Sequence, residues 1–369
     1  MEKHAIVIGA SAVGSITAKE LVKRGIEVDL LEEDSRVGKF GKCGGIFSKH
    51  GMDFTGVNYA DLILNEIRGA RIIAGKEELK VKSSAVQAVV LPRQSFDERA
   101  ADEAVAAGAN LHLNTRVRGF EVNQKINVQT TDDGAFSSNV IIGCDGNASL
   151  TARKLGFPPI KLSDCVICYQ AEYSKADVPE KDIVDLILDQ SHYRNFFAWT
   201  IPISDERIRI GVATTEINKI ENAKRAALEN PYLANIIKGS HKTFEFHHMI
   251  PLRYRKHTQK RFGNSYALLV GDAAGQVKAT SGGGVNFGAK CAKVAAKGTA
   301  EYLIEGKELD YESAWQLQHG ETLKLHYLLH RLYRLMPNWL SELGVGVGRR
   351  IGMGKLLEKY GDMDYVFKI

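Results

Sequence analysis

Residues 4–14 read His-Ala-Ile-Val-Ile-Gly-Ala-Ser-Ala-Val-Gly, an apolar run that ends in a glycine turn. The run predicts a buried parallel strand, and residues 15–24 predict a helix that Gly25 terminates. Glycine at position 9 lets the strand turn sharply, and glycine at position 14 lets the helix pack close to the sheet. A strand, glycine turn and helix in this order favour pyrophosphate binding at the helix N-terminus.

Two neighbouring residues refine this interpretation. Glu32 follows an apolar run at 28–31, near the offset of about 20 residues expected for a ribose-binding carboxylate. Ser11 replaces the middle glycine of the pattern, where the backbone approaches phosphate most closely, and its hydroxyl could itself contact phosphate. The alternative is an ordinary strand–helix turn in which the glycines occur by chance.

Further glycine segments also follow apolar runs. Residues 143–149 read Gly-Cys-Asp-Gly-Asn-Ala-Ser, residues 271–275 read Gly-Asp-Ala-Ala-Gly, and Gly-Gly-Gly-Val at 282–285 opens a predicted helix over 286–303. A helix N-terminus stabilises nearby negative charge by about 0.3–2 kcal/mol, and glycines let a ligand come close.

The composition is that of an ordinary globular protein, with 369 residues, 44% hydrophobic and 25% charged. No apolar run reaches about 18 residues, so we expect no membrane-spanning helix. No basic-then-apolar leader opens the chain. The five cysteines are sparse and odd in number, which favours a reducing cytoplasm. The net charge of +5 suits an anionic substrate or membrane surface better than nucleic acid, for which we find no motif.

The patterns predict an α/β chain (α+β overall) in three parts. Residues 1–155 and 256–305 are expected to form a discontinuous nucleotide-binding domain. Residues 156–255 are expected to form a substrate domain built on an antiparallel sheet, to which part of 50–90 contributes. Residues 306–369 are expected to be a helical region.

Within these parts, residues 96–108 predict a helix with a glycine stop. Strands are predicted at 110–118, 126–130 and 138–142. The C-terminal helices are expected to end at a glycine-rich break around 344–348.

The order of the motifs at 9–14, Glu32, 143–149 and 271–275 resembles the FAD-dependent aromatic hydroxylase superfamily. This resemblance implies a Rossmann-like FAD-binding domain of the aromatic hydroxylase type, with an inserted antiparallel-sheet substrate domain and a C-terminal helical region.

Other segments are more specific. Lys-Cys-Gly-Gly at 42–45, together with 271–278 and 280–285, resembles the geranylgeranyl reductase family, and most nearly the archaeal digeranylgeranylglycerophospholipid reductases. An aromatic-x-Trp-x-x-Pro segment at 197–202 and Gly-Asp-Met-Asp at 361–364 are also similar to that family. The resemblance covers most of the chain.

The family implies one non-covalently bound FAD, with Asp272 on a ribityl hydroxyl and Arg93 in contact with the cofactor. Without the resemblance, Asp272 reads as a helix N-cap and Arg93 as a solvated arginine. The implied FAD-binding residues are Gly9, Ser11, Ala12, Val13, Gly14, Glu32, Gly44, Gly45, Arg93, Val117, Asp272, Gly275, Gly282, Gly283, Gly284 and Val285. The implied substrate wall is Phe197, Trp199 and Pro202; for the two aromatics the alternative is ordinary core packing.

The family also implies the chemistry. Reduced flavin would deliver a hydride to one carbon of an isolated isoprenoid C=C bond in a prenylated glycerophospholipid, and a proton would reach the other carbon. Positioning and exclusion of water would carry much of the catalysis. No second Rossmann fingerprint for a nicotinamide cofactor is found, so ferredoxin, a deazaflavin and NADPH all remain open as electron donor.

The cysteines give one catalytic hypothesis. Cys43 lies in the loop that the family places near the flavin ring, where it could assist protonation or form a redox-sensitive pair with Cys291. The alternative is a small buried residue beside glycines. Cys165 and Cys168 have CxxC spacing, but no second pair accompanies them and they do not open a helix, so we expect no metal site.

A C-terminal leucine stripe predicts an amphipathic helix. A basic helix of this kind can lie on an anionic membrane, and the alternative is core packing with a solvated basic face. The hypothesis is a cytoplasmic protein that is peripheral on the inner face of the cell membrane. The stripe is Leu325, Leu328, Leu329, Leu332 and Leu335, with Lys324, His330, Arg331 and Arg334 on the polar side and Trp339 following.

Rival functions remain at this point. One is a hydroxylase or halogenase-type FAD monooxygenase, because 197–202 partly matches the halogenase pattern Trp-x-Trp-x-Ile-Pro, with Phe197 in place of the first tryptophan. Another is a non-catalytic prenyl-lipid binding protein, which would not need three FAD motifs. A quinone-linked electron-transfer flavoprotein would carry an iron–sulfur cysteine cluster, which the sequence lacks.

Overall fold

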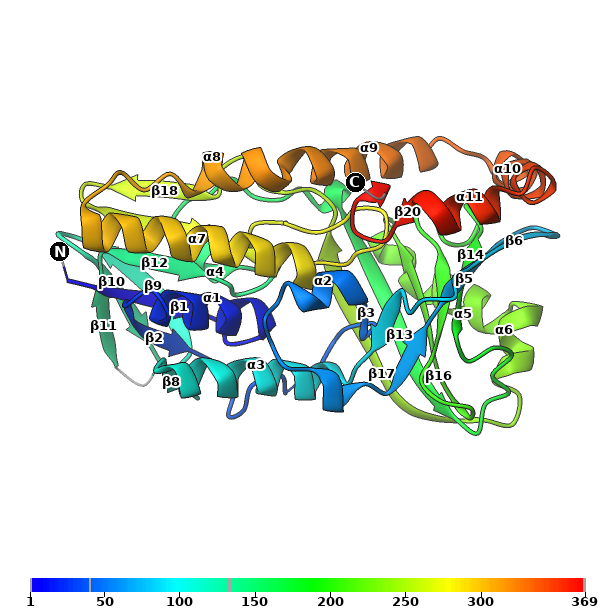
Figure 1. The fold of residues 1–369 in the computed structure, drawn as a ribbon, viewed down its shortest axis with the longest axis horizontal. Coiled ribbons are helices and arrows are strands. Elements are labelled where there is room, and N and C mark those ends of the chain that lie inside the picture. Colours follow the sequence, from blue (N-terminus) through cyan, green and yellow to red (C-terminus); the bar gives the residue numbers. More distant parts are fainter. Residues whose placement is uncertain (1, 40, 132–133, 368–369) are drawn as a thin grey trace.

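The computed structural model describes residues 2–39, 41–131 and 134–367, which form two lobes side by side with helices along one edge (Figure 1). The first lobe contains a six-stranded sheet, parallel except for one edge strand. Its strand order is β18 (Gln259–Phe262), β19 (Ser265–Leu269), β12 (Val140–Gly143), β1 (His4–Ile8), β2 (Glu27–Leu31) and β8 (Asn110–His112).

Both faces of this sheet are covered, which explains the continuous apolar run of β1. Ala5 and Val7 belong to the apolar cluster with the helices, and Ile6 and Ile8 to the cluster on the opposite face. The helices are α1 (Ala12–Val22), α3 (Arg93–Ala107) and α7 (Val285–Glu305). The opposite face is covered by the antiparallel strands β9 (Val117–Val122), β10 (Ile126–Thr130) and β11 (Ala135–Ser138) and by α4 (Leu150–Lys154).

The second lobe is built on a seven-stranded sheet in which every neighbouring pair is antiparallel except β14 and β5. Helices α5 (Ile220–Glu229) and α6 (Pro231–Ile236) pack on one of its faces. The strand order is β17 (His241–Pro251), β13 (Cys165–Ser174), β16 (Arg207–Thr214), β15 (Ala198–Pro202), β14 (Ile183–Leu188), β5 (Gly69–Ala74) and β6 (Glu77–Lys82).

A small sheet and the C-terminal helices complete the molecule. The small sheet, β3 (Ile46–Ser48), β7 (Ala88–Val90) and β4 (Asn65–Ile67), packs against β15, and α2 (Lys49–Asp53) follows β3. The chain ends with α8 (Tyr311–Trp315), α9 (Glu321–Tyr333), α10 (Asn338–Arg350), α11 (Met353–Tyr360) and the hairpin of β20 (Gly361–Asp362) and β21 (Val366–Phe367). None of the helices in the described ranges is long and apolar enough to cross a membrane.

The predicted fold class is confirmed, but two local predictions were wrong. The stretch 110–118 is not one strand: β8 and β9 belong to different sheets, and Asn114 between them has a positive φ of 56°. The glycines at 344–348 do not break the last helices, because α10 runs through them. A Cβ on Gly346 would lie 2.9 Å from Glu77 Cδ, so glycine here allows α10 to pack closely on β6.

Candidate active site

The turn after β1 has the geometry of a phosphate cradle. Gly9 has a φ of 93°, and a Cβ there would lie 2.8 Å from the Cys144 carbonyl oxygen. A Cβ on Gly14 would lie 1.8 Å from the Gly9 carbonyl oxygen. Ser11 is the N-cap of α1 in extended conformation, and the Val13 side chain fills the space in front of Gly271. The chain therefore needs glycine at both ends of this turn.

Glu32 lies at the end of β2, next to this turn. Its Oε2 accepts a hydrogen bond from the Ala10 N–H at 2.9 Å, and its Oε1 accepts one from the Asp34 N–H at 3.0 Å. Burial raises the pKa of Glu32, and the two backbone hydrogen bonds oppose that rise. Val117, at the start of β9, packs instead against the apolar cluster beneath the sheet.

Arg93 joins the first turns of α3 and α1. Its Nε donates to Asp97 Oδ1 at 2.8 Å, and the same oxygen accepts from the Ala12 N–H at 2.9 Å. Burial acts to lower the pKa of Arg93, but Asp97 and Cys43 outweigh it, so the pKa lies above its ordinary value. The guanidinium thus lies between the N-terminus of α1 and the Cys43 loop.

Asp272 lies in a 3₁₀ turn over Gly271–Ala273, directly after β19. A Cβ on Gly284, at the start of α7, would lie 2.5 Å from Asp272 Oδ1, so the two segments touch. Burial raises the pKa of Asp272, while His248 and Arg93 act against that rise. Burial lowers the pKa of His248, and Asp272 opposes the shift. The site therefore includes His248, which the sequence analysis missed.

The glycines of the following loop are also placed here. Gly275 and Gly282 each have a φ of 74°, and a Cβ on Gly275 would lie 2.4 Å from the Arg253 carbonyl oxygen. Gly283 lies against the Lys278 side chain, and Val285 is the first residue of α7. The cofactor-binding residues implied for the C-terminal half of the chain therefore lie around the N-terminal end of α7.

The face of the seven-stranded sheet opposite α5 meets the loop that contains Cys43. The Trp199 Nε1–H donates to Gln170 Oε1 at 3.0 Å, and the Gln170 amide donates to the Cys43 carbonyl at 3.2 Å. A Cβ on Gly44 would lie 3.4 Å from Ile201 Cδ1. Phe197 meets Trp199 edge-to-face, with ring centroids 6.0 Å apart. Phe197 and Trp199 therefore lie together beside the loop.

Pro202 does not share this face. Side chains alternate along β15, and Thr200, which has the same parity as Pro202, bonds Asp185 on the other side of the sheet.

Arg209 was missed by the sequence analysis: its Nη1–H donates to the Gly44 carbonyl at 2.9 Å. Gly45, with a φ of 69°, is held so close that a Cβ would lie 2.2 Å from Arg209 Nη1.

All five cysteine thiols are free. Cys43 is half-buried, and its sulfur accepts the Gly45 N–H at 3.4 Å. Cys291 is completely buried within the core cluster around α7. Cys165 and Cys168 are three residues apart on β13, so their side chains point to opposite faces of the sheet.

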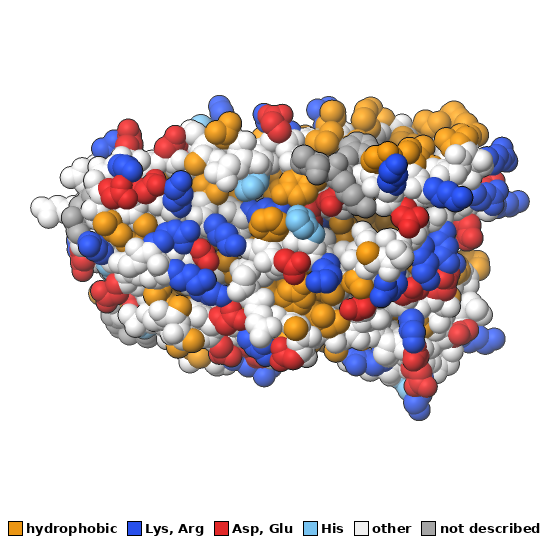
Figure 2. Space-filling model, in the orientation of Figure 1, with side chains coloured by type: hydrophobic (Ala, Val, Ile, Leu, Met, Phe, Trp, Pro, Cys, Tyr) orange, Lys and Arg blue, Asp and Glu red, His pale blue; other side chains and the backbone are white. Residues whose placement is uncertain are grey.

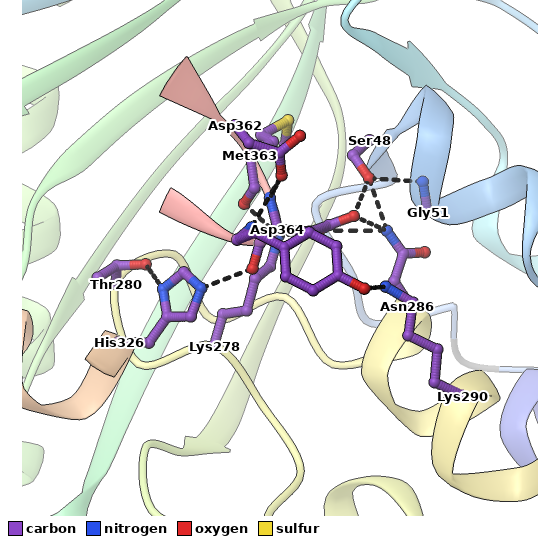
Figure 3. Close-up of polar contacts among 11 residues, drawn as sticks. Ser48, Gly51, Lys278, Thr280, Asn286, Lys290, His326, Asp362, Met363 and Asp364 are labelled. Atoms are coloured by element: carbon purple, nitrogen blue, oxygen red, sulfur yellow. Dashed lines mark hydrogen bonds and ion pairs between the residues drawn. The ribbon is translucent and has the colours of Figure 1, made fainter. Parts of the chain in front are cut away.

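The C-terminal segment closes the loop that precedes α7 (Figure 3). Lys278 Nζ forms a buried ion pair with Asp364 Oδ1 at 2.6 Å and donates to the Met363 carbonyl at 2.9 Å. Ser48 and Asn286 also donate to the Asp364 carboxylate. Burial raises the pKa of Asp364, but Lys278 and the hydrogen bond from Ser48 lower it below the ordinary value.

The backbone of Lys278 connects the Lys278–Asp364 ion pair to the glycine turn at 282–283. The Lys278 N–H donates to the Gly283 carbonyl at 3.1 Å, and the Gly282 N–H donates to the Lys278 carbonyl at 2.8 Å. His326 of α9 braces the other side, since it contacts Thr280 Oγ1 at 2.7 Å and the Asp364 carbonyl at 2.8 Å. One signal for this network is visible in the sequence, the Gly-Asp-Met-Asp segment at 361–364.

These residues fit a dinucleotide flavin. Two backbone positions without Cβ and a helix N-terminus suit a pyrophosphate, and Glu32 and Asp272 provide carboxylates at the ends of β2 and β19. No cluster of three or more histidine, cysteine or acidic side chains that could hold a metal occurs in the described ranges.

Comparison with known proteins agrees with this site. Residues 2–309 match the family model described as FAD binding domain. An uncharacterized protein of Methanocaldococcus jannaschii is 29% identical over 97% of this chain and 91% of its own length. A digeranylgeranylglycerophospholipid reductase of Methanopyrus kandleri is 26% identical over 92% of this chain and 88% of its own. A solved geranylgeranyl bacteriochlorophyll reductase-like protein of Thermoplasma acidophilum has the same fold, with a TM-score of 0.80 at 18% identity over 94% of this chain and 91% of its own.

Proposed function

Because the chain belongs to the FAD-binding domain family and uses FAD as its cofactor, we propose that it is a flavin-dependent reductase of isoprenoid C=C bonds. The proposed substrate is a prenylated glycerophospholipid, the class named for the Methanopyrus kandleri relative. The reaction adds a hydride equivalent and a proton across each double bond, and the flavin is oxidised in the same turnover.

The observation that carries this proposal is the apolar sheet face beside the Cys43 loop. Phe197, Trp199 and Ile201 lie on this face, and the Gln170 bridge fixes it to the loop. An isolated alkene has no polar group by which to be oriented, so a shaped apolar wall that excludes water is what the reaction needs. When bound and reduced, FAD supplies the hydride, and the protein orients the substrate.

We assign Cys43 as the residue that holds the proton for the second carbon. Cys43 is half-buried, its side chain is close to Arg93, and its carbonyl is joined through Gln170 to the same wall. A general acid has to lie within hydrogen-bond reach of the reacting atom. Cys43 lies in the loop that the Gln170 bridge holds against the wall. We further propose a cytoplasmic location with contact to the membrane that holds the lipid.

The function is tested without air and without the natural electron donor. The purified protein is reduced with dithionite and mixed with a geranylgeranylated glycerophospholipid in detergent. We expect the flavin to be reoxidised, and the lipid to gain mass in steps of two hydrogens. Flavin absorbance and product mass spectra are recorded on the same samples.

The matched control is the same lipid with fully saturated chains, which should leave the flavin reduced. A flavin that stays reduced with the unsaturated lipid until air is admitted would favour the monooxygenase class instead. A purified protein that binds no flavin but binds the lipid would favour a carrier. Either result would overturn the proposed reaction.

Gly211→Ala tests the apolar wall. A Cβ at this position would lie 2.2 Å from the Trp199 ring, so the indole has to move. We expect the KM for the lipid to rise by about tenfold, equivalent to about 1.4 kcal/mol, while the FAD dissociation constant stays unchanged. Trp199→Phe, which keeps a ring but removes the donor to Gln170, should have a smaller effect. An unchanged KM in Gly211→Ala would remove Trp199 from the substrate wall.

A further inference from the structure

The large apolar side chains that the structure leaves exposed are concentrated in one part of the molecule. Among the described residues, twelve of the twenty such side chains lie between positions 317 and 363. The most exposed on α9 to α11 are Leu335 at 80%, Trp339 at 65% and Ile351 at 65%. Figure 2 shows the apolar side chains gathered along the upper right edge, over the region of α9 and α10. A contiguous patch of this kind marks an interaction site.

Helix α9 buries two histidines and turns most of its leucine stripe outward. His326 and His330 are 2% and 4% exposed and bond the carbonyls of Asp364 and Asn195, whereas Leu328 and Leu332 face outward. The alternative of core packing with a solvated basic face is therefore wrong for this stripe. Polar contacts and the buried Leu323 attach the helix to the protein, and the exposed leucines of the stripe are left for another partner.

The turn between α9 and α10 is attached in the same way. The Gln190 amide donates to the Tyr333 carbonyl at 3.0 Å, and the Gln190 N–H donates to Asn338 Oδ1 at 2.6 Å. Leu335 and Trp339 flank this anchored turn. Their exposure thus belongs to an ordered part of the fold.

Basic side chains surround the apolar surface. Seven lysines and arginines but only three glutamates lie between 321 and 360. An open hollow of about 470 Å³ on α11 has both apolar and basic lining residues. The apolar ones include Ile351, Leu356 and Tyr360, and the basic ones are Lys355 and Lys359. The exposed basic residues of the rim are Arg331, Arg334, Arg349, Arg350, Lys355 and Lys359.

We propose that the outward surface of α9, α10 and α11 docks the protein on an anionic lipid bilayer. The apolar side chains would enter the boundary between headgroups and acyl chains, with Trp339 at the interface, and the basic rim would meet the phosphates. A second copy of this chain would meet like charge with like charge across the same surface. The choice of a bilayer also rests on the proposed function, because the proposed substrate is a membrane lipid.

The test is co-sedimentation of the full-length flavoprotein with vesicles. We expect binding to vesicles of an equal mixture of phosphatidylglycerol and phosphatidylcholine, and weaker binding to phosphatidylcholine alone or in high salt. The double variant Leu335→Glu/Trp339→Glu should lower the vesicle partition coefficient by about tenfold or more. The matched control, Leu162→Glu/Phe244→Glu, changes two other exposed apolar residues, 65% and 50% exposed, that lie elsewhere, and it should bind like the wild type.

Activity on detergent-solubilised lipid separates the two proposals. The Leu335/Trp339 variant should reduce solubilised lipid at the wild-type rate and lipid in vesicles more slowly. A wild type that reduces solubilised lipid but ignores anionic vesicles overturns the docking surface and leaves the proposed function intact. A dimer in solution that the same variant dissociates, with no vesicle binding, also overturns it. Vesicle binding without any lipid reduction supports the surface and counts against the function.

Discussion

Gly14→Ala is expected to abolish FAD binding, with a loss of affinity of about a hundredfold or more, equivalent to about 2.7 kcal/mol. The new Cβ would lie 1.8 Å from the Gly9 carbonyl oxygen. The backbone fixes the position of a Cβ, and the oxygen is itself a backbone atom of the turn between β1 and α1, so no side-chain rotation relieves the overlap. The turn has to open, and the helix N-terminus then leaves the position from which it would bind the pyrophosphate.

The measurement is a fluorescence titration of FAD into the flavin-free protein, together with circular dichroism to show that the variant is folded. Gly298→Ala is the control, because nothing lies within 4 Å of a Cβ at that position of α7. That control should bind FAD like the wild type and gain about 0.8–1.0 kcal/mol of stability from helix propensity. A folded Gly14→Ala protein with unchanged FAD affinity would show that the cofactor is bound elsewhere.

Lys278→Met is expected to lower the free energy of unfolding by about 3–5 kcal/mol. The substitution leaves the buried Asp364 carboxylate without its only ion-pair partner among the described residues. The double variant Lys278→Met/Asp364→Leu should recover part of the loss, because it removes the unpaired charge as well. Denaturant unfolding of both variants and the wild type measures the difference. Equal stability of Lys278→Met and wild type would mean that the pair is not buried in solution.

The pH dependence gives this prediction a second signature. In the wild type the folded-state pKa of Asp364 is lowered, so its contribution to stability is present above the unfolded-state pKa of about 3.9 and is lost as the pH falls through the folded-state value. In Lys278→Met, burial remains and the main lowering charge is gone. The folded-state pKa of Asp364 should then be higher than in the wild type, although Ser48 and Lys290 still lower it. The variant's deficit in stability should therefore shrink as the pH falls toward 4. A deficit that is independent of pH would point to lost packing only.

The parts of the fold that the sequence predicted are those specified by neighbours in the chain. Gly9 and Gly14 identify the turn because their steric requirement is local, and Gly108, with a φ of 114°, ends α3 where the pattern places it. Strands were also predicted at 126–130 and 138–142, and β10 occupies the first of these ranges while β12 overlaps the second.

The parts that the sequence missed depend on pairings between distant segments. His248 and Cys168 lie opposite each other on β17 and β13, so they share a face, but nothing near either residue reveals that register. Gln170 and Arg209 act on the loop at 43–45 from the other lobe. The stripe on α9 was recognised, but periodicity alone cannot say which side faces the protein, since that depends on the carbonyls of Asn195 and Asp364.

The parallel pairing of β5 with β14 has a consequence for how the chain reaches its fold. Arg71 and Asp185 are register partners and also form a hydrogen bond, although 114 residues separate them. During synthesis, one edge of β5 therefore stays unpaired until its partner strand β14 has left the ribosome. Long-range parallel pairing of this kind is slow and leaves strand edges exposed to aggregation. A fragment of residues 156–255 would lack β5 and would expose β14 as an open edge, so the second lobe is expected to misfold when it is expressed alone.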